Sequence, residues 1–220
     1  MTQVHAFTFN PFAENTYIVY DDSQQCIIVD PGCYTAEERQ ALQAFIEQQQ
    51  LTPVGLLNTH CHIDHVFGNR FVAETYGLPL AIHVGELPVL EAIPAVAQLY
   101  GIPHVQQSPD PSPDHYLQEG QVYTFGQTSL EIRFTPGHSP ASVSLYCKDS
   151  DFILAGDVLF QGSIGRTDLP GGNYNTLMQR IDTQLLPLPD HTVVYSGHGP
   201  ATSIGAERRS NPFILEYHNT

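Results

Sequence analysis

The chain has 220 residues, of which 41% are hydrophobic, and its 8 basic and 23 acidic side chains give a formal charge of −15. This length and apolar content are enough for a sizeable buried core, and they argue against a disordered chain. The acidic balance argues against a nucleic-acid partner, because an acidic surface repels phosphate backbones.

The amino terminus and the cysteines predict where the protein resides. The opening segment MTQVHAFTFNPF has neither the basic start nor the apolar run of a secretory signal. No segment approaches the ~18 apolar residues that favour a membrane span. The cysteines show neither a disulfide framework nor a CxxC site; they are Cys26, Cys33, Cys61 and Cys147. We therefore expect a cytoplasmic protein with reduced thiols that does not associate with a membrane.

The first half of the chain predicts short strands that alternate with two helices. Thr35 and Glu38 form a capping box that opens a helix to about Gln50, and a second helix is expected over Asn69–Tyr76. The expected strands are Val4–Phe9, Asn15–Tyr20, Gln25–Asp30, Pro53–Asn58 and Pro79–His83.

The second half begins with a proline-rich stretch, residues 87–120, which we expect to be the least regular part of the chain. Further strands are predicted over Gln121–Phe125, Leu130–Phe134, Ala141–Cys147, Asp151–Ala155 and Thr192–Tyr195, and helices over Tyr174–Leu185 and Ile204–Ser210. The strands fall into two groups, each with helices attached. This order predicts two sheets packed on each other with helices outside.

One short segment, THCHIDH, concentrates metal-binding side chains at the end of the predicted strand Pro53–Asn58. His60 and His62 are two residues apart, so in an extended backbone they point the same way. Asp64 and His65 are adjacent and are expected to diverge from each other. The loop thus offers an imidazole pair on one side and a carboxylate with an imidazole on the other. Cys61, between two ligands, is expected to point away as a small filler.

Three later segments repeat the arrangement of an apolar strand that ends in a small residue and then a metal-binding side chain. They are TPGHS with His138, AGD with Asp157 and SGHGP with His198. Because zinc takes about four ligands, the THCHIDH loop alone is incomplete and these residues are candidates to complete it. Asp30, in the turn VDPG, is either an acceptor for the N–H group of a ligand histidine or only a turn former.

The complete set of motifs resembles the metallo-β-lactamase superfamily, whose pattern T-H-x-H-x-D-H is followed by distant G-H, G-D and G-H pairs. Within it the chain is most similar to short bacterial members of the glyoxalase II-like group. That similarity rests on VDPG, THCHIDH, TPGHS, GDVLFQGSIGRTDLP, SGHGP and ERRSNPF. The resemblance implies an α+β fold, the αββα sandwich, with a metal site at one edge of two packed sheets.

The resemblance also implies which residues hold two divalent metal ions. It assigns His60, His62 and His138 to one ion, Asp64, His65 and His198 to the other, and Asp157 as the bridge between them. Zinc is the expected metal, and iron and manganese are the alternatives.

A glyoxalase II-like site predicts hydrolysis of an acyl thioester such as S-lactoylglutathione by a metal-bound hydroxide. Two cations about 3.5–4 Å apart can generate that nucleophile and polarise the carbonyl oxygen. Asp64 is the expected catalytic residue, orienting the hydroxide and handling its proton. A thiolate, with a pKa of about 8.5, leaves without much help from an acid. An amide, as in a β-lactam, needs a proton on nitrogen and therefore ranks lower.

The chain departs from full-length glyoxalase II in lacking the C-terminal helical domain that supplies basic residues to glutathione, so recognition of glutathione stays open. We expect a single metallo-hydrolase domain over residues 1–220. Phe160, Arg166 and Tyr174 are the candidate contacts to a small-molecule thioester. Arg166 and Asp168 can instead form an ion pair that fixes their own loop. The oligomeric state is not predicted.

Two other enzymatic readings use the same ligand motifs. The first is a mononuclear iron persulfide dioxygenase, which uses only the positions of His60, His138 and Asp157 for iron. The second is a lactonase or another ester hydrolase. A metal-stabilised binding protein is disfavoured, because a structural zinc needs only four ligands whereas seven are present.

Overall fold

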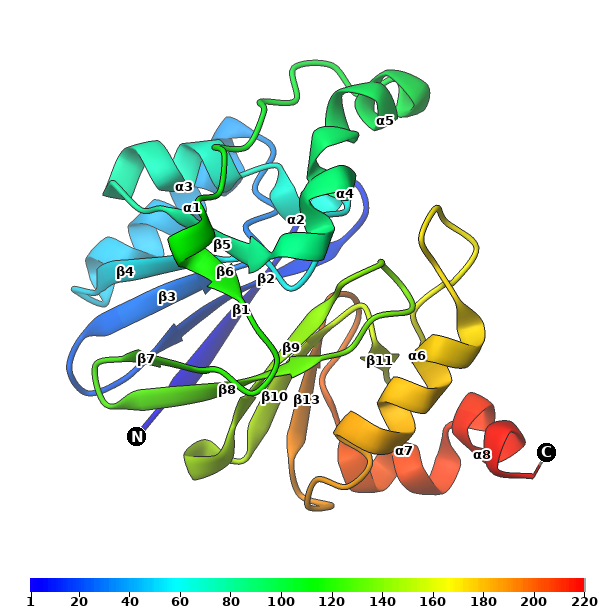
Figure 1. The fold of residues 1–220 in the computed structure, drawn as a ribbon. Helices are drawn as coiled ribbons and strands as arrows, with labels where there is room; N and C mark the ends of the chain where they lie inside the picture. The colour runs from blue at the N-terminus through cyan, green and yellow to red at the C-terminus, as the bar shows by residue number, and fades with distance from the viewer. Residues whose placement is uncertain (220) are drawn as a thin grey trace. The chain divides into compact units, whose positions relative to one another are not determined.

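The computed structural model describes residues 1–219, and the chain divides into two compact units. Unit 1 comprises Met1–Leu117 and Thr124–Thr128, and unit 2 comprises Gln118–Tyr123 and Ser129–Thr220. Figure 1 traces the elements of each unit in chain order. The expected single domain over residues 1–220 stays a prediction.

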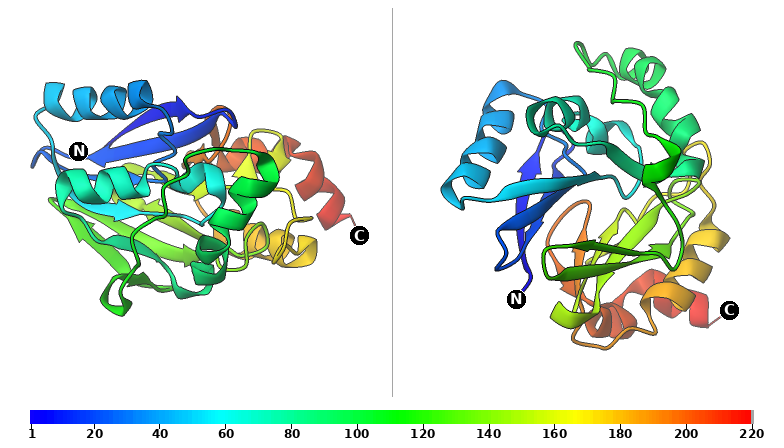
Figure 2. Two further views of the ribbon diagram at one scale, coloured as in Figure 1. Left: turned by 90° about the horizontal axis from the view of Figure 1, so that it is seen from above. Right: turned by 60° about the vertical axis from the view of Figure 1, so that its left-hand side comes forward.

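Unit 1 contains a six-stranded mixed sheet with the strands in sequence order. The first three strands are antiparallel and the remaining pairs are parallel. The strands are β1 (Gln3–Phe9), β2 (Glu14–Tyr20), β3 (Gln25–Val29), β4 (Thr52–Leu57), β5 (Leu80–His83) and β6 (Tyr116–Leu117). Helices α1 (Ala36–Gln48) and α3 (Asn69–Tyr76) make the parallel connections and lie on the same face of this sheet (Figure 2).

The core of unit 1 forms where these two helices cover the sheet. Leu42 and Ile46 of α1 and Val72 of α3 are buried in one cluster with Ile18, Ile28, Leu56, Leu80 and Ile82 of the strands. Leu80 and Ile82 are two residues apart in β5, and Leu42 and Ile46 are four apart in α1, so each of these elements presents one apolar face to this layer. The predicted strands and helices of this half are therefore confirmed, with shifts of one or two residues at their ends.

The proline-rich stretch, residues 87–120, is regular at its two ends and irregular between them. It follows η1 (Val84–Glu86) and contains α4 (Leu87–Glu91), α5 (Ile93–Tyr100) and η2 (Pro113–His115). Pro88, Pro94 and Pro113 each stand in the first turn of their helix, where a proline sacrifices no hydrogen bond and its fixed φ suits the helix. The predicted irregularity is confirmed for residues 101–112, which form no helix or strand, and it is wrong for α4 and α5.

The second six-stranded sheet has the order β14-β13-β10-β9-β8-β7. Its strands are β7 (Val122–Phe125), β8 (Thr128–Phe134), β9 (Val143–Cys147), β10 (Phe152–Gly156), β13 (Val193–Ser196) and β14 (Thr202–Ser203). Strands β10 and β13 are parallel, so their carboxyl ends lie at the same edge. A short hairpin, β11 (Leu159–Phe160) and β12 (Ser163–Ile164), follows β10.

Three helices cover the core of unit 2. They are α6 (Tyr174–Arg180), which continues into one turn of π-helix, η4 (Ile181–Leu185), then α7 (Ile204–Ser210) and α8 (Pro212–His218). Leu177, Ile204 and Ile214 of these helices are buried with Ile153 of β10 and Val194 of β13. The predicted helix Tyr174–Leu185 is thus α-helical only to Arg180. Helix α8 was not predicted. Asn211 at the N-cap and Pro212 in the first turn are nevertheless typical of a helix start.

The remaining expectations on thiols and membrane spans can be compared with residues 1–219. All four cysteines are free and buried. Within that range no helix combines the length and apolar character that a membrane crossing requires. The cytoplasmic location stays a prediction.

The capping box of α1 gives a test of local stability. The side chain of Thr35 accepts a hydrogen bond from the amide of Glu38, and the Glu38 carboxylate accepts one from the amide of Thr35. We expect Thr35→Ala to lower the free energy of unfolding by about 1 kcal/mol, because an amide of the first turn loses its acceptor. Urea unfolding of both proteins measures this, with Gln40→Ala on the exposed side of α1 as the control. Equal losses in the two variants would show that the box contributes nothing.

Candidate metal centre

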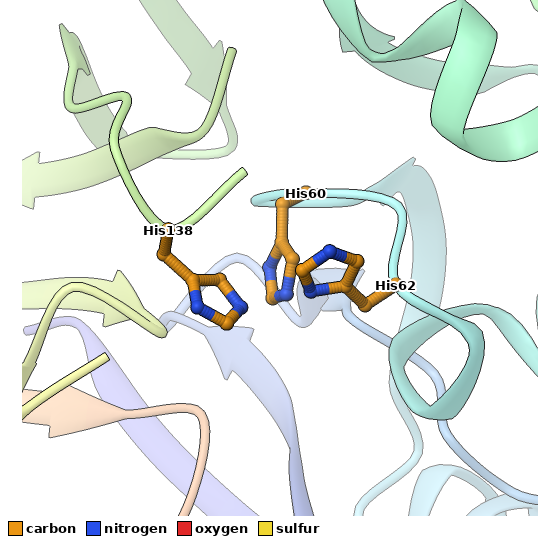
Figure 3. Close-up of side chains that lie close together, drawn as sticks. All are labelled: His60, His62 and His138. Carbon is orange, nitrogen blue, oxygen red and sulfur yellow. The ribbon is translucent and has the colours of Figure 1, made fainter. Parts of the chain in front are cut away.

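The loop that follows β4 carries the first two predicted ligands. Strand β4 ends at Leu57, and His62 is the residue that precedes helix α2 (Ile63–Val66). The rings of His60 and His62 have centroids 4.8 Å apart and are nearly perpendicular, and each offers a nitrogen within 4.8 Å of the other. Figure 3 shows the two rings side by side on this loop. The predicted imidazole pair is confirmed as a pair within unit 1.

Asp64 and His65 converge, whereas the sequence predicted that they diverge. The Oδ2 atom of Asp64 lies 3.8 Å from Nε2 of His65. The expectation was wrong because it assumed an extended backbone, while residues Ile63–Val66 form a helical turn. In a helical turn adjacent side chains are about 100° apart rather than on opposite faces. Both side chains are buried, and together they form a second imidazole–carboxylate pair in unit 1.

The buried carboxylate of Asp30 holds this ligand loop in place. Its Oδ1 accepts hydrogen bonds from the amide of Thr59 at 2.7 Å and from Nδ2 of Asn58 at 3.3 Å. Its Oδ2 accepts from the Thr59 hydroxyl at 2.6 Å and lies 3.2 Å from Nδ1 of His65. Asp30 also has a positive φ of 50°. Asp30 is therefore more than a turn former, because its carboxylate holds Thr59 and Asn58 and lies beside the ring of His65.

The same network fixes which ring nitrogen of His60 faces a ligand. The Thr59 hydroxyl donates to Asp30, so its oxygen is the acceptor for Nδ1 of His60 at 3.1 Å. Nδ1 therefore carries the proton, and Nε2 is left as the donor atom for a cation. An oxygen of Asp30 lies within 4.8 Å of nitrogens of His60 and His65. Because its oxygens already accept these hydrogen bonds, we assign Asp30 to support rather than to ligation.

Two further buried polar groups support the loop, and the sequence did not single them out. The Glu86 carboxylate accepts a hydrogen bond of 2.9 Å from the amide of Cys61, between the two histidines. Asn58 donates to the carbonyl of His65 and accepts from Asn69, which also donates to Ser108. The Cys61 side chain lies in the apolar core of unit 1, as predicted. Nothing in a single sequence marks these acceptors, because their partners are distant along the chain.

Glu14 adds a buried acid close to this network. Its Oε2 accepts from the Thr16 hydroxyl at 3.0 Å, and its Oε1 lies 3.8 Å from Nδ1 of His65. Burial raises the pKa of Glu14 well above its usual range, because the charged form loses its water, while the nearby His65 acts in the opposite direction. Unit 1 thus contains a histidine pair and a carboxylate–imidazole pair beside further buried carboxyl groups.

Unit 2 carries the other three predicted ligands, each in the loop that follows a strand. His138 follows β8, Asp157 follows β10 and His198 follows β13. The Oδ2 atom of Asp157 lies 3.4 Å from Nε2 of His138 and 3.5 Å from Nε2 of His198. One carboxylate oxygen therefore stands between two imidazoles, which is the arrangement of a bridging ligand with one histidine on each side.

A backbone carbonyl fixes the orientation of His138. Its Nδ1 lies 2.8 Å from the carbonyl oxygen of Arg166. Because a carbonyl only accepts, Nδ1 carries the proton and Nε2 is the donor atom that faces Asp157. The chain can return this close to Asp157 because residue 165 is glycine, where a Cβ would collide with the Asp157 carbonyl.

The predicted substrate contacts lie in unit 2 at different distances from the ligands. The ring of Phe160 lies 6.3 Å from that of His198, centroid to centroid, edge to face. Tyr174 is 39% exposed at the start of α6. Arg166 forms a two-pronged ion pair with Asp168, both bonds 2.7 Å long, and its hydrogen bonds lower the pKa of Asp168 to about 2. Arg166 and Asp168 thus form the ion pair that the sequence offered as the alternative to a substrate contact.

The spacing of the donor atoms fits a bound cation. Two ligands about 2.0–2.1 Å from a tetrahedral zinc ion lie about 3.3 Å from each other. The Nε2 to Oδ2 separations in unit 2 are close to this value and longer than an ordinary hydrogen bond. The donors are neutral imidazole nitrogens and a carboxylate, which suit zinc, iron and manganese. The residues present therefore fit divalent metal ions.

A family model described as the Metallo-beta-lactamase superfamily matches residues 9–198. The chain belongs to this superfamily. The predicted family and the mixed α/β fold class are thus confirmed, and the chain is a metallo-hydrolase of this superfamily. Its histidine-rich clusters are candidate metal sites.

Several similar proteins align with nearly the whole chain. Hydroxyacylglutathione hydrolase GloC of Haemophilus influenzae is 37% identical over 205 residues, covering 92% of this chain and 93% of that protein. This similarity confirms the glyoxalase II-like branch. The crystal structure of BLEG-1 B3 metallo-beta-lactamase is 38% identical with a TM-score of 0.87, covering 96% and 99% of the two chains. TTHA1623 in a di-iron-bound form is 35% identical with a TM-score of 0.84, covering 95% and 99%.

The Asp30 network gives a test that needs neither substrate nor metal. Asn tolerates a positive φ, so Asp30→Asn keeps the backbone and the shape but leaves fewer acceptors for the buried donors. We expect the free energy of unfolding of the chelator-treated protein to fall by about 1–3 kcal/mol, measured in urea. Asp110→Asn, an exposed site in the same unit, is the control. A variant as stable as the control would contradict the role of Asp30.

Proposed function

We propose that this protein hydrolyses acyl thioesters such as S-lactoylglutathione at a dinuclear metal centre held by the seven ligands that the family resemblance implies. The observation that carries the proposal is the position of Asp157, whose one oxygen lies 3.4 and 3.5 Å from the imidazoles of His138 and His198. A carboxylate oxygen placed between two imidazoles could be shared by two cations, one held by each histidine.

The number of candidate metal-binding side chains is consistent with the two ligand groups of this proposal. Unit 1 offers two pairs, His60 with His62 and Asp64 with His65. Neither pair alone fills the four positions of a zinc ion. The proposed centre adds His138 to the first pair and His198 to the second, and both groups share Asp157. Each ion then has four protein ligands.

The chain's own residues account for the proton and the leaving group. Bound divalent ions supply an activated water and polarise the carbonyl oxygen of the substrate. The Asp64 side chain is 13% exposed, so one face of its carboxylate is open to orient that water and hold its proton. Asp30 and the Arg166 carbonyl keep His65 and His138 in one orientation. A thiolate then leaves without a proton, since its pKa is about 8.5.

For the substrate, we propose that Phe160 and Tyr174 contribute most of the contact. Phe160 already packs beside His198, and Tyr174 is exposed enough to reach a ligand. Arg166 stays a candidate for an anionic group of the substrate only if its guanidinium exchanges Asp168 for that group. Zinc is the proposed metal because of its preference for imidazole and carboxylate, and the di-iron form of TTHA1623 supports iron as the alternative.

A second candidate is hydrolysis of a β-lactam, which is favoured by the 38% identity to BLEG-1 B3 metallo-beta-lactamase. The leaving group separates the two activities. The nitrogen of an opened β-lactam needs a proton, whereas a thiolate does not. We therefore rank thioester hydrolysis first, and a direct comparison of both substrates decides between them.

The ligand assignment predicts the effect of removing one donor from each pair of unit 1. We expect His62→Ala combined with Asp64→Ala to lower kcat/KM for S-lactoylglutathione by about 10³-fold or more, because the activated water and its orienting carboxylate are both lost. Circular dichroism checks that the fold persists. The matched control replaces two exposed residues, Asp110→Ala with His218→Ala, and should keep the activity of the unmodified protein. A ligand double variant with unchanged kcat/KM would refute the mechanism.

Metal content and a substrate panel distinguish the proposed function from its competitors. We expect two divalent ions per chain by elemental analysis, together with faster turnover of S-lactoylglutathione than of a β-lactam. One iron per chain with oxygen uptake on glutathione persulfide would instead identify a persulfide dioxygenase. Turnover of the β-lactam alone would identify a β-lactamase.

A further inference from the structure

We propose that Glu207 of α7 and Asn211, which lies between α7 and α8, are positioning residues that hold the β11–β12 hairpin beside the candidate ligands of unit 2. The hairpin connects the bridging Asp157 to the carbonyl that orients His138. This inference rests on the proposed metal centre, and it assigns to the C-terminal helices a part in holding the cations.

The Glu207 carboxylate is a buried acceptor with three donors. The residue is 1% exposed. Its Oε2 accepts 2.8 Å hydrogen bonds from the amide of Gly162 and from Nδ2 of Asn211, and its Oε1 accepts from the Thr202 hydroxyl at 2.6 Å. A buried carboxylate is stable only when donors replace its lost water, so these three groups are fixed relative to each other.

Asn211 extends the same contact to the next residue of the hairpin. Its Nδ2 donates to the carbonyl of Ser163 at 3.0 Å, while its Oδ1 accepts from the amide of Phe213 at 3.1 Å and caps α8. Both residues of the hairpin that face this segment, Gly162 and Ser163, are therefore bound by it. Hydrogen bonds through Asn211 therefore connect the start of α8 to the tip of the hairpin.

The hairpin needs such anchors because it is too short to hold itself. It has only two residue pairs, Leu159 with Ile164 and Phe160 with Ser163. An isolated two-stranded hairpin is marginally stable at best. On its other side the Ser196 hydroxyl donates to the carbonyl of Leu159 at 2.7 Å. The hairpin is thus fixed between the strand that leads to His198 and the segment of Glu207.

Both ends of the hairpin lead to the ligands. Asp157 lies two residues before β11, and Arg166, whose carbonyl accepts from His138, lies two residues after β12. The amide of Gly165 donates to the carbonyl of Val158, which closes the base of the hairpin. Phe160, at its centre, lies beside His198. A hairpin that loses its anchors therefore loosens the surroundings of all three ligands of unit 2.

The test compares three variants by zinc retention and by steady-state kinetics. Glu207→Ala removes the acceptor. Asn211→Ser keeps an oxygen to cap α8 but removes the donor to Ser163. Glu207→Gln keeps an oxygen for Gly162, and its amide can donate to the Thr202 oxygen, so it serves as the conservative rescue. Glu216→Ala, at an exposed position of α8, is the matched control.

We expect the zinc-loaded Glu207→Ala and Asn211→Ser proteins to lose zinc to a chromophoric chelator about tenfold faster than the unmodified protein, with a raised KM for S-lactoylglutathione. Glu207→Gln and Glu216→Ala should retain zinc normally. If Glu207→Ala does not fold by circular dichroism, Asn211→Ser decides. Normal zinc retention and KM in the folded variants would overturn the inference.

The zinc readout separates this inference from the proposed function. If the unmodified protein binds zinc but does not hydrolyse thioesters, the proposed function fails, and zinc retention alone still decides the role of Glu207. If the unmodified protein binds no divalent ion, both fail together.

Discussion

The arrangement of ligand side chains in this protein depends on buried carboxylates that accept hydrogen bonds from the loops around them. In unit 1 the Asp30 carboxylate binds the amide and hydroxyl of Thr59 and stands beside His65. Without such an acceptor, the loop after β4 would have to bury several donors unpaired, which is costly in a low-dielectric interior. Buried hydrogen bonds to Asp30 therefore hold the loop that carries the candidate ligands.

In unit 2 a different set of groups holds the candidate ligands. Its ligands follow three strands, and the backbone carbonyl of Arg166 orients His138 while Glu207 fixes the hairpin between them. The glycines at residues 137 and 165 allow the backbone to approach Leu177 and Asp157 where a Cβ would collide. The strands bring each side chain to the same region of unit 2, and hydrogen-bond acceptors nearby fix its orientation.

Membership of the metallo-β-lactamase superfamily leaves the substrate open, because a fold of this kind hosts several reactions. The relatives illustrate this range, since one is a hydroxyacylglutathione hydrolase and another is a B3 metallo-beta-lactamase at nearly the same identity. The choice of thioester over β-lactam therefore rests on the leaving group rather than on resemblance. In the proposed function, Phe160 and Tyr174 would be the residues through which substrate preference varies without change to the ligands.

The sequence by itself determined the family, the candidate ligands and most of the regular elements, because these depend on local pattern. The capping box at Thr35, the helix Ile204–Ser210 and the pairing of His60 with His62 follow from residues close together in the chain. Local patterns failed where the same residues are compatible with two structures. A proline can end a helix or begin one, as it does in α4 and α5. The segment with Asp64 and His65 can be extended or helical, and the helical turn brings the two side chains together.

Only the tertiary structure decided which groups support the ligands. Glu86 reaches Cys61, Asp30 reaches His65, and Glu207 reaches Gly162 across 25, 35 and 45 residues of sequence. These contacts arise because burial forces distant polar groups to satisfy each other, and no local pattern encodes which partner is met. The sequence could therefore name candidate ligand side chains, whereas the fold was needed to show which groups surround them.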